Sequence, residues 1–66
     1  MPTAYPNLQE VMGEKGVTVE DLAKLIDNSE EITRLKMRGI REWTLSEALA
    51  VCRYLHYPDF RKLFLR

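Results

Sequence analysis

Residues 18–39 read TVEDLAKLIDNSEEITRLKMRG, and this stretch predicts two short helices joined by a tight turn. Thr18 is followed three residues later by Asp21, an acidic variant of the capping box that is typical of a helix start. We expect this helix to end near Asp27 and Asn28, because asparagine tolerates the left-handed backbone of a turn. Its apolar residues recur at helical spacing and form the expected buried face: Val19, Leu22, Ala23 and Ile26.

The second helix of this pair is predicted over residues 29–38. Ser29 can accept a hydrogen bond as the N-cap, and Gly39 is a typical helix stop. Ile32 and Leu35 share the face that is expected to be buried. The connection between the two helices is about three residues long, which is the spacing of a helix-turn-helix.

Helix signals continue on both sides of this pair. An N-terminal helix is expected over residues 7–15, and Thr44-Leu45-Ser46-Glu47 is a full capping box that begins another. That helix continues to about Leu55, because Tyr57-Pro58 interrupts it. Asp59 can cap a last short helix that carries apolar residues at helical spacing.

These signals predict an all-α fold, a compact five-helix bundle containing a helix-turn-helix, in a single domain of residues 1–66. The expected buried residues are Leu22, Ala23, Ile26, Leu45, Ala48, Leu49 and Cys52. Replacing Leu49 by alanine is expected to cost about 2–5 kcal/mol. Trp43 is expected to pack under the loop with its indole N–H bonded to a backbone carbonyl.

Composition excludes several classes of protein. No segment approaches the roughly 18 apolar residues of a membrane span, and the first residues lack a signal-peptide pattern, so we expect a cytoplasmic location. Cys52 and His56 are the single residues of their types, which leaves no intrachain disulfide and no zinc site. With no nucleophile–base set and no glycine-rich phosphate loop, we expect no catalytic site, no metal, no cofactor and no enzymatic activity.

The charges are balanced in total but unevenly distributed along the chain. Ten basic and ten acidic residues give a net charge of zero, where a nucleic-acid-binding protein usually has a basic surplus. Residues 1–31 hold two bases and seven acids, a net charge of −5, whereas residues 32–66 hold eight bases and three acids, a net charge of +5. Scattered solvated charges explain this as well as a basic binding face does.

Several short motifs, in this order and at this spacing, resemble those of one known family. They are Tyr5-Pro6-Asn7-Leu8, Lys15-Gly16-Val17-Thr18, Asp21-Leu22-Ala23, Gly39 and Trp43-Thr44-Leu45-Ser46-Glu47-Ala48. The chain resembles small phage- and plasmid-borne members of the lambda-repressor-like (Cro/repressor type) helix-turn-helix family from about Tyr5 to Phe64. The resemblance implies a DNA-binding transcriptional regulator of the phage-repressor type, with residues 29–38 as recognition helix.

The resemblance also implies which residues contact double-stranded DNA. Those expected to face base edges or phosphates are Ser29, Glu30, Glu31, Arg34 and Leu35. Those expected to contact neighbouring phosphates are Lys36, Arg38 and Arg41. Proteins of this kind usually bind paired half-sites as homodimers, and the apolar segment Phe60 to Leu65 is the expected dimer contact.

This sequence departs from the family in its third helix. Glu30 and Glu31 stand where small or amide residues are usual, and Leu35 stands where a polar residue is expected. Acids in a first helical turn complement the helix dipole, which explains them without DNA. Leu35 and Met37 suit a protein contact as well as the core. The alternative is therefore a protein–protein interaction module that keeps the repressor-like fold without specific DNA binding.

Overall fold

Each helix after the first begins at the cap that the sequence predicts. In the computed structural model, the Thr18 hydroxyl accepts from the Asp21 backbone N–H at 3.2 Å, and Asp21 Oδ2 accepts from the Thr18 N–H at 3.0 Å. Ser29 accepts from the Ile32 N–H at 3.1 Å, and Asp59 caps the last helix. These bonds satisfy backbone donors that a helix start otherwise leaves free.

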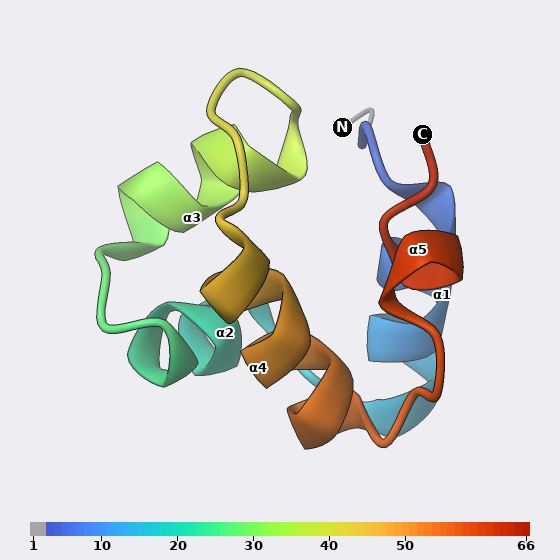
Figure 1. Cartoon of the computed structure of the whole chain (residues 1–66). Coiled ribbons are helices and arrows are strands. Elements are labelled where there is room, and N and C mark those ends of the chain that lie inside the picture. Colours follow the sequence, from blue (N-terminus) through green and yellow to red (C-terminus); the bar gives the residue numbers. More distant parts are fainter. Residues whose placement is uncertain (1–2) are drawn as a thin grey trace.

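The structure describes residues 3–66, and all regular secondary structure in that range is helical (Figure 1). The five helices are α1 (Pro6–Lys15), α2 (Val19–Leu25), α3 (Glu30–Met37), α4 (Leu45–Leu55) and α5 (Phe60–Leu63). The predicted all-α, five-helix fold is confirmed. Met1 and Pro2, which the sequence places in the same domain, lie outside the described residues.

The turn after α2 differs from the expectation that Asn28 adopts the left-handed conformation. The left-handed residue of the turn after α2 is Asp27, with φ of 55°, and not Asn28. The Asn28 side chain instead accepts a hydrogen bond from the Ser29 N–H at 3.1 Å. After α3, Gly39 has φ of 78°, and a Cβ there would lie 2.9 Å from the Cβ of Ala4. Glycine is therefore required at this position both by the backbone angle and by the close approach of the N-terminal segment.

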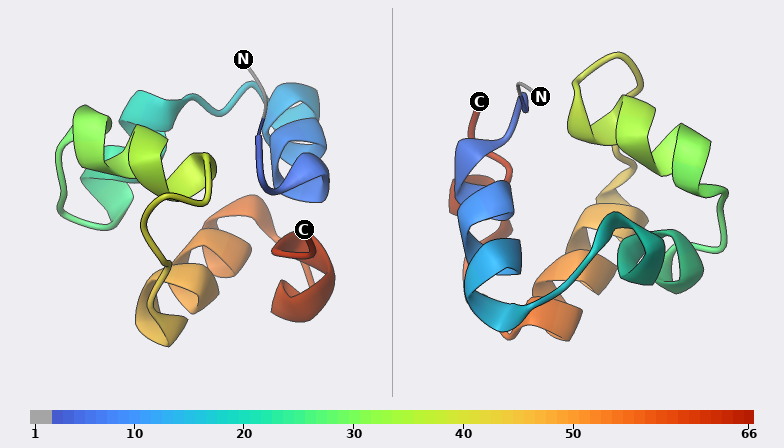
Figure 2. Two further views of the ribbon diagram at one scale, coloured as in Figure 1. Left: turned by 90° about the horizontal axis from the view of Figure 1, so that it is seen from above. Right: turned by 180° about the vertical axis from the view of Figure 1, so that it is seen from behind.

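The helices pack in two groups joined by α4. Figures 1 and 2 show α2 and α3 side by side as the helix-turn-helix, and α5 against α1 on the other side. Helix α4 contacts α1, α2 and α5. The backbone N–H of Ala4 and the hydroxyl of Thr3 both donate to the Met37 carbonyl, so the N-terminal segment is tied to the end of α3.

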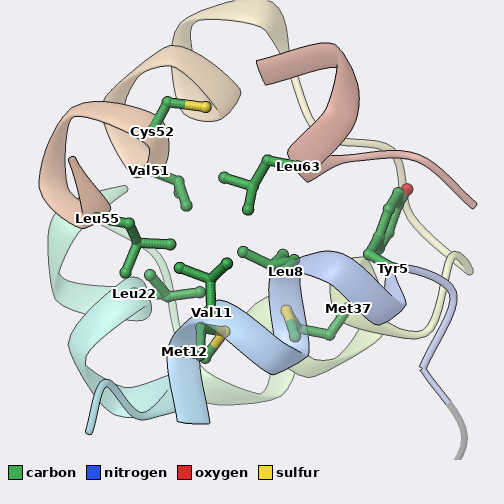
Figure 3. Close-up of a cluster of buried hydrophobic side chains, with 10 residues drawn as sticks. All are labelled: Tyr5, Leu8, Val11, Met12, Leu22, Met37, Val51, Cys52, Leu55 and Leu63. Atoms are coloured by element: carbon green, nitrogen blue, oxygen red, sulfur yellow. The ribbon is translucent and has the colours of Figure 1, made fainter. Parts of the chain in front are cut away.

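One apolar core lies where these helices meet (Figure 3). Its buried members are Tyr5, Leu8, Val11, Met12, Leu22, Met37, Val51, Cys52, Leu55 and Leu63. The predicted burial of Leu22, Ala23, Ala48 and Cys52 is confirmed. Ile26 is half-buried and packs at the edge of the core.

The predicted burial of Leu45 and Leu49 is wrong. Their side chains are 62% and 39% exposed. The face of α4 that meets the core consists of Ala48, Val51, Cys52 and Leu55, spaced at three and four residues. Leu45 and Leu49 lie on the flank of that stripe, which neither α1 nor α2 covers.

The inward face of α3 also differs from the expectation. Thr33, Lys36 and Met37 are buried, whereas Ile32 and Leu35 are only half-buried. The two sets have the same helical spacing, so periodicity alone does not choose between them. Packing against the N-terminal segment and α4 selects the set that contains Met37.

The core can be tested with two leucines of one helix. Leu55→Ala should lower the free energy of unfolding by about 2–5 kcal/mol, because Leu55 is fully buried. Leu49→Ala should cost about 1 kcal/mol or less, because that side chain keeps much of its contact with water. Urea unfolding followed by circular dichroism measures both. Equal losses would contradict this assignment of the α4 faces.

Candidate nucleic-acid interface

The orientation of α3 is set by its buried side. Thr33 is fully buried, and its hydroxyl donates to the Ser29 carbonyl at 2.8 Å. Met37 is buried in the core and lies one turn further along the same face. The Thr33 bond lies within the helix itself, so burial of Thr33 and Met37 orients α3 and leaves its opposite side turned to solvent.

The solvent side of α3 carries most of the residues expected to contact DNA. At 100° per residue, Glu31, Leu35 and Arg38 lie opposite the buried face. Glu31 and Arg38 are exposed, and Leu35 is half-buried. Glu30 and Arg34 form the flank nearer to Met37, with their charged groups 4.0 Å apart in an exposed ion pair. The structure therefore gathers four charged side chains and one leucine on the outer face of one short helix.

Ser29 and Arg41 stand at the two ends of this face. Ser29 is exposed, but its hydroxyl serves as the N-cap of α3. Arg41 is exposed in the loop after α3, and its backbone N–H donates to the Leu35 carbonyl at 3.2 Å. This bond keeps the Arg41 backbone close to the C-terminal end of the helix.

Lys36 does not belong to this exposed face, contrary to the sequence-based expectation. It is only 6% exposed, and its ammonium forms an ion pair with Glu47 of α4. The Nζ atom also lies 5.8 Å from the centroid of the Trp43 ring. A lysine held in this way cannot reach a phosphate, so Lys36 is a structural residue.

Glu47 joins this ion pair to the start of α4. One carboxylate oxygen accepts from Lys36 and from the Thr44 backbone N–H at 3.0 Å, and the Glu47 N–H donates to the Thr44 hydroxyl at 3.1 Å. Burial raises the pKa of Glu47, but the bonds from Lys36 and Thr44 and the charge of Lys36 outweigh burial. The pKa of Glu47 therefore lies below its ordinary value.

The environment of Trp43 differs from the prediction. Its indole N–H is buried with no hydrogen-bond partner among the described residues, where a backbone carbonyl was expected. The ring instead packs edge-on against Phe64, with centroids 5.2 Å apart, and Phe64 packs in the same way against Tyr5. Aromatic and cation–π contacts place Trp43, because no carbonyl of the loop turns toward its nitrogen.

Residues 3–66 offer little support for a metal site, a membrane span or a reactive cysteine. No three His, Cys, Asp or Glu side chains come together as metal ligands there, and no helix of that range is long and apolar enough to cross a bilayer. Cys52 is buried as expected, and burial together with the charge of Asp59 raises the pKa of its thiol. A thiol with a raised pKa is a weak nucleophile at neutral pH.

Two positions of α3 could not be assigned correctly without the structure. Thr33 and Lys36 are polar residues on the buried face, and the sequence favours Ile32 and Leu35 there because they are apolar. One signal does favour the observed face: Thr33 and Met37 are four residues apart, and Met37 is the last apolar residue before Gly39.

Comparison with known proteins identifies the domain. The family model of the Cro/C1-type HTH DNA-binding domain matches residues 7–57, which span α1 to α4 and end before α5. Neither a curated protein nor a solved structure matches the chain.

The Lys36–Glu47 pair leads to a stability prediction. Glu47→Gln should lower the free energy of unfolding by about 1.5–3 kcal/mol, because it leaves a buried ammonium with a neutral acceptor and no counter-charge. The contribution of Glu47 should be full above its ordinary pKa of 4.5 and lost as pH falls through the lower pKa of the folded state. Thermal unfolding of both proteins as a function of pH measures this.

Glu10→Gln, on the exposed side of α1, is the matched control and should leave stability nearly unchanged. The stability of Glu47→Gln should still fall somewhat in acid, because Asp21 also has a lowered pKa. Its hydrogen bonds with the backbone and side chain of Thr18 cause that shift. Wild-type stability and an unchanged pH profile in Glu47→Gln would show that the ion pair contributes nothing.

Proposed function

Because the chain belongs to the family of Cro/C1-type HTH DNA-binding domains, we propose that it regulates transcription in the manner of a phage repressor. In this proposal α3 is the recognition helix and enters the major groove of double-stranded DNA. The observation that carries the proposal is the family match, together with an α3 on whose outer face Glu31, Arg34 and Arg38 are exposed. The DNA-contacting set is Ser29, Glu30, Glu31, Arg34, Leu35, Arg38 and Arg41, with Lys36 removed.

The charges of this face imply weak and salt-dependent binding. Arg34, Arg38 and Arg41 are exposed and can neutralise phosphates. Glu30 and Glu31 oppose the phosphates, although a glutamate can accept from the N4 amino group of cytosine. Without Lys36, the proposed DNA-contacting face carries three arginines and two glutamates. Base contacts must therefore supply much of the specificity.

One short helix offers few base contacts, so we propose that the protein acts as a homodimer. Two recognition helices about 34 Å apart would read two half-sites of one operator. Within the expected contact segment, Phe60 to Leu65, Leu63 is fully buried and Phe64 packs on Trp43, whereas Leu65 is 61% exposed and can reach a partner. We place the contact on the α4–α5 face, defined as Leu45, Leu49 and Phe60. These residues line two adjoining grooves, both of which include Phe60.

A protein-interaction module is the alternative, and one observation favours it. Ile40 is 60% exposed next to the outer face of α3, where Leu35 is half-buried. Apolar side chains at the centre of a binding face suit a protein partner better than a phosphate backbone. The zero net charge points the same way. Neither proposal involves an enzyme or a cofactor.

The arginines test DNA binding directly. Arg34→Ala and Arg38→Ala should each weaken binding to duplex DNA and lower the slope of log affinity against log salt by about one. Lys15→Ala, an exposed base of α1 outside both α3 and the α4–α5 face, is the control and should change neither quantity. Fluorescence anisotropy with a duplex selected from a random pool measures both. If Lys15→Ala lowers affinity and slope as much as the two arginine variants, the DNA surface lies elsewhere.

The glutamates should act in the opposite direction. Replacing Glu30 and Glu31 by glutamine should raise affinity for unrelated duplexes, because two repulsive charges are removed. If either acid accepts from a cytosine, the preference for the selected sequence should fall at that position. The affinities of the variant for selected and scrambled duplexes, compared at one salt concentration, give the result. Unchanged affinity for both would place α3 outside the DNA contact.

Self-association tests the dimer. Replacing Leu45 and Leu49 by glutamate should abolish dimer formation while the helical signal persists, because both side chains are largely outside the core. Tyr54→Glu, at another exposed position of α4, is the control. Sedimentation equilibrium, alone and with DNA, measures the change. A chain that stays monomeric and shows no preference among random duplexes at low salt would contradict the regulator and leave the interaction module.

A further inference from the structure

A groove of about 420 Å³ lies between α1, the segment that leads into α2, and α3. In the right-hand view of Figure 2, α1 and α3 stand apart above the connection between α1 and α2. The apolar side chains in the groove are Met12, Val17, Val19 and Met37. Its volume lies within the range of roughly 300–1,000 Å³ that is usual for small-molecule sites.

Two charged residues line this groove, and both are arginines: Arg34 of α3 and Arg38 at its C-cap. Arg34 and Arg38 stand on its wall, and the other polar residues there are Thr3, Gln9 and Thr18. The ion pair that Arg34 forms with Glu30 is long, at 4.0 Å, and exposed, so Glu30 competes weakly with another anion. An apolar interior beside two guanidinium groups is complementary to a molecule with an apolar body and an anionic head.

Gly13 keeps this groove open on the α1 side. It lies inside a helix, where glycine costs about 0.5–1 kcal/mol relative to alanine. A Cβ at Gly13 would meet nothing within 4 Å, so packing does not require the glycine. The helix thus has a gap where a larger residue would narrow the groove.

We propose that this groove binds a small aliphatic carboxylate, such as a medium-chain fatty acid. The hydrocarbon chain lies against Met12, Val17 and Met37, and the carboxylate lies between Arg34 and Arg38. Two flexible methionine side chains can adapt to a chain of variable shape. The ligand occupies the same arginines that we assign to DNA, so its binding releases DNA. This last step rests on the function proposed above, whereas binding of the carboxylate does not.

Octanoate is the probe for binding to the full chain. In a titration below its micelle concentration, followed by ¹⁵N–¹H NMR, saturable shifts are expected at the amides of Met12, Gly13, Val17 and Val19. Octylamine has the same apolar chain with the opposite charge, and it should produce no saturable shifts at these amides. No saturation with octanoate, or equal saturation with octylamine, would overturn the proposal.

Two variants separate the apolar and charged parts of the site. Gly13→Leu fills the groove and should weaken octanoate binding at least tenfold without weakening DNA binding. Ser46→Leu adds the same side chain to α4, outside the groove, and should leave octanoate binding unchanged. Replacing Arg34 and Arg38 by glutamine should weaken octanoate about tenfold. Unchanged octanoate affinity in Gly13→Leu, with its helical signal retained, would contradict the site.

Competition tests the link to DNA. Octanoate at ten times its dissociation constant should raise the apparent dissociation constant for the selected duplex about tenfold in the wild type. The same concentration should raise it at most about twofold in Gly13→Leu, because octanoate binds that variant at least tenfold more weakly. Octanoate binding without any change in DNA affinity would contradict the release of DNA. If no duplex binds at all, the proposed regulator fails, and the NMR titration still decides whether the groove is a carboxylate site.

Discussion

The ion pair between Lys36 and Glu47 is the contact on which the rest of the structure depends. A lysine on the buried face of α3 must find a counter-charge, because a buried ammonium without one is strongly disfavoured. Glu47 supplies that charge while it closes the capping box of α4. This pair, together with the buried Thr33 and Met37, therefore fixes how α3 turns about its axis, and Glu47 marks where α4 begins. The outer face of α3 follows from that orientation.

A small core explains why so much apolar surface remains outside it. A chain of 66 residues buries only about 60% of the surface of its unfolded state. The inward stripe of α4 is filled by Val51, Cys52 and Leu55, which leaves Leu45 and Leu49 on its flank. In the proposals above, these exposed side chains contact a second copy, whereas the groove beside α3 holds a smaller molecule.

Glu30 and Glu31 on the outer face of α3 stabilise the helix. Glu30 and Glu31 lie in the first turn, where they favour the positive end of the helix dipole, and Glu30 also pairs with Arg34. These gains stabilise a helix of eight residues that is too short to persist alone. The same charges oppose a phosphate backbone. If α3 is the recognition helix, as proposed, its stability and its affinity for DNA make opposite demands on the same two residues.

Local sequence patterns determined the positions of the helices. The capping boxes at Thr18 and Thr44 and the cap at Ser29 depend on neighbouring residues, so the sequence was sufficient to predict them. Tertiary structure decided which side of α3 meets the core and left Leu45 and Leu49 of α4 exposed, whereas the inward position of Ala48 and Cys52 was predicted from the sequence. Two faces of equal periodicity differ only in what packs against them, and the sequence does not show that Lys36 would meet Glu47. A buried ion pair between residues 11 positions apart reversed the expected role of Lys36.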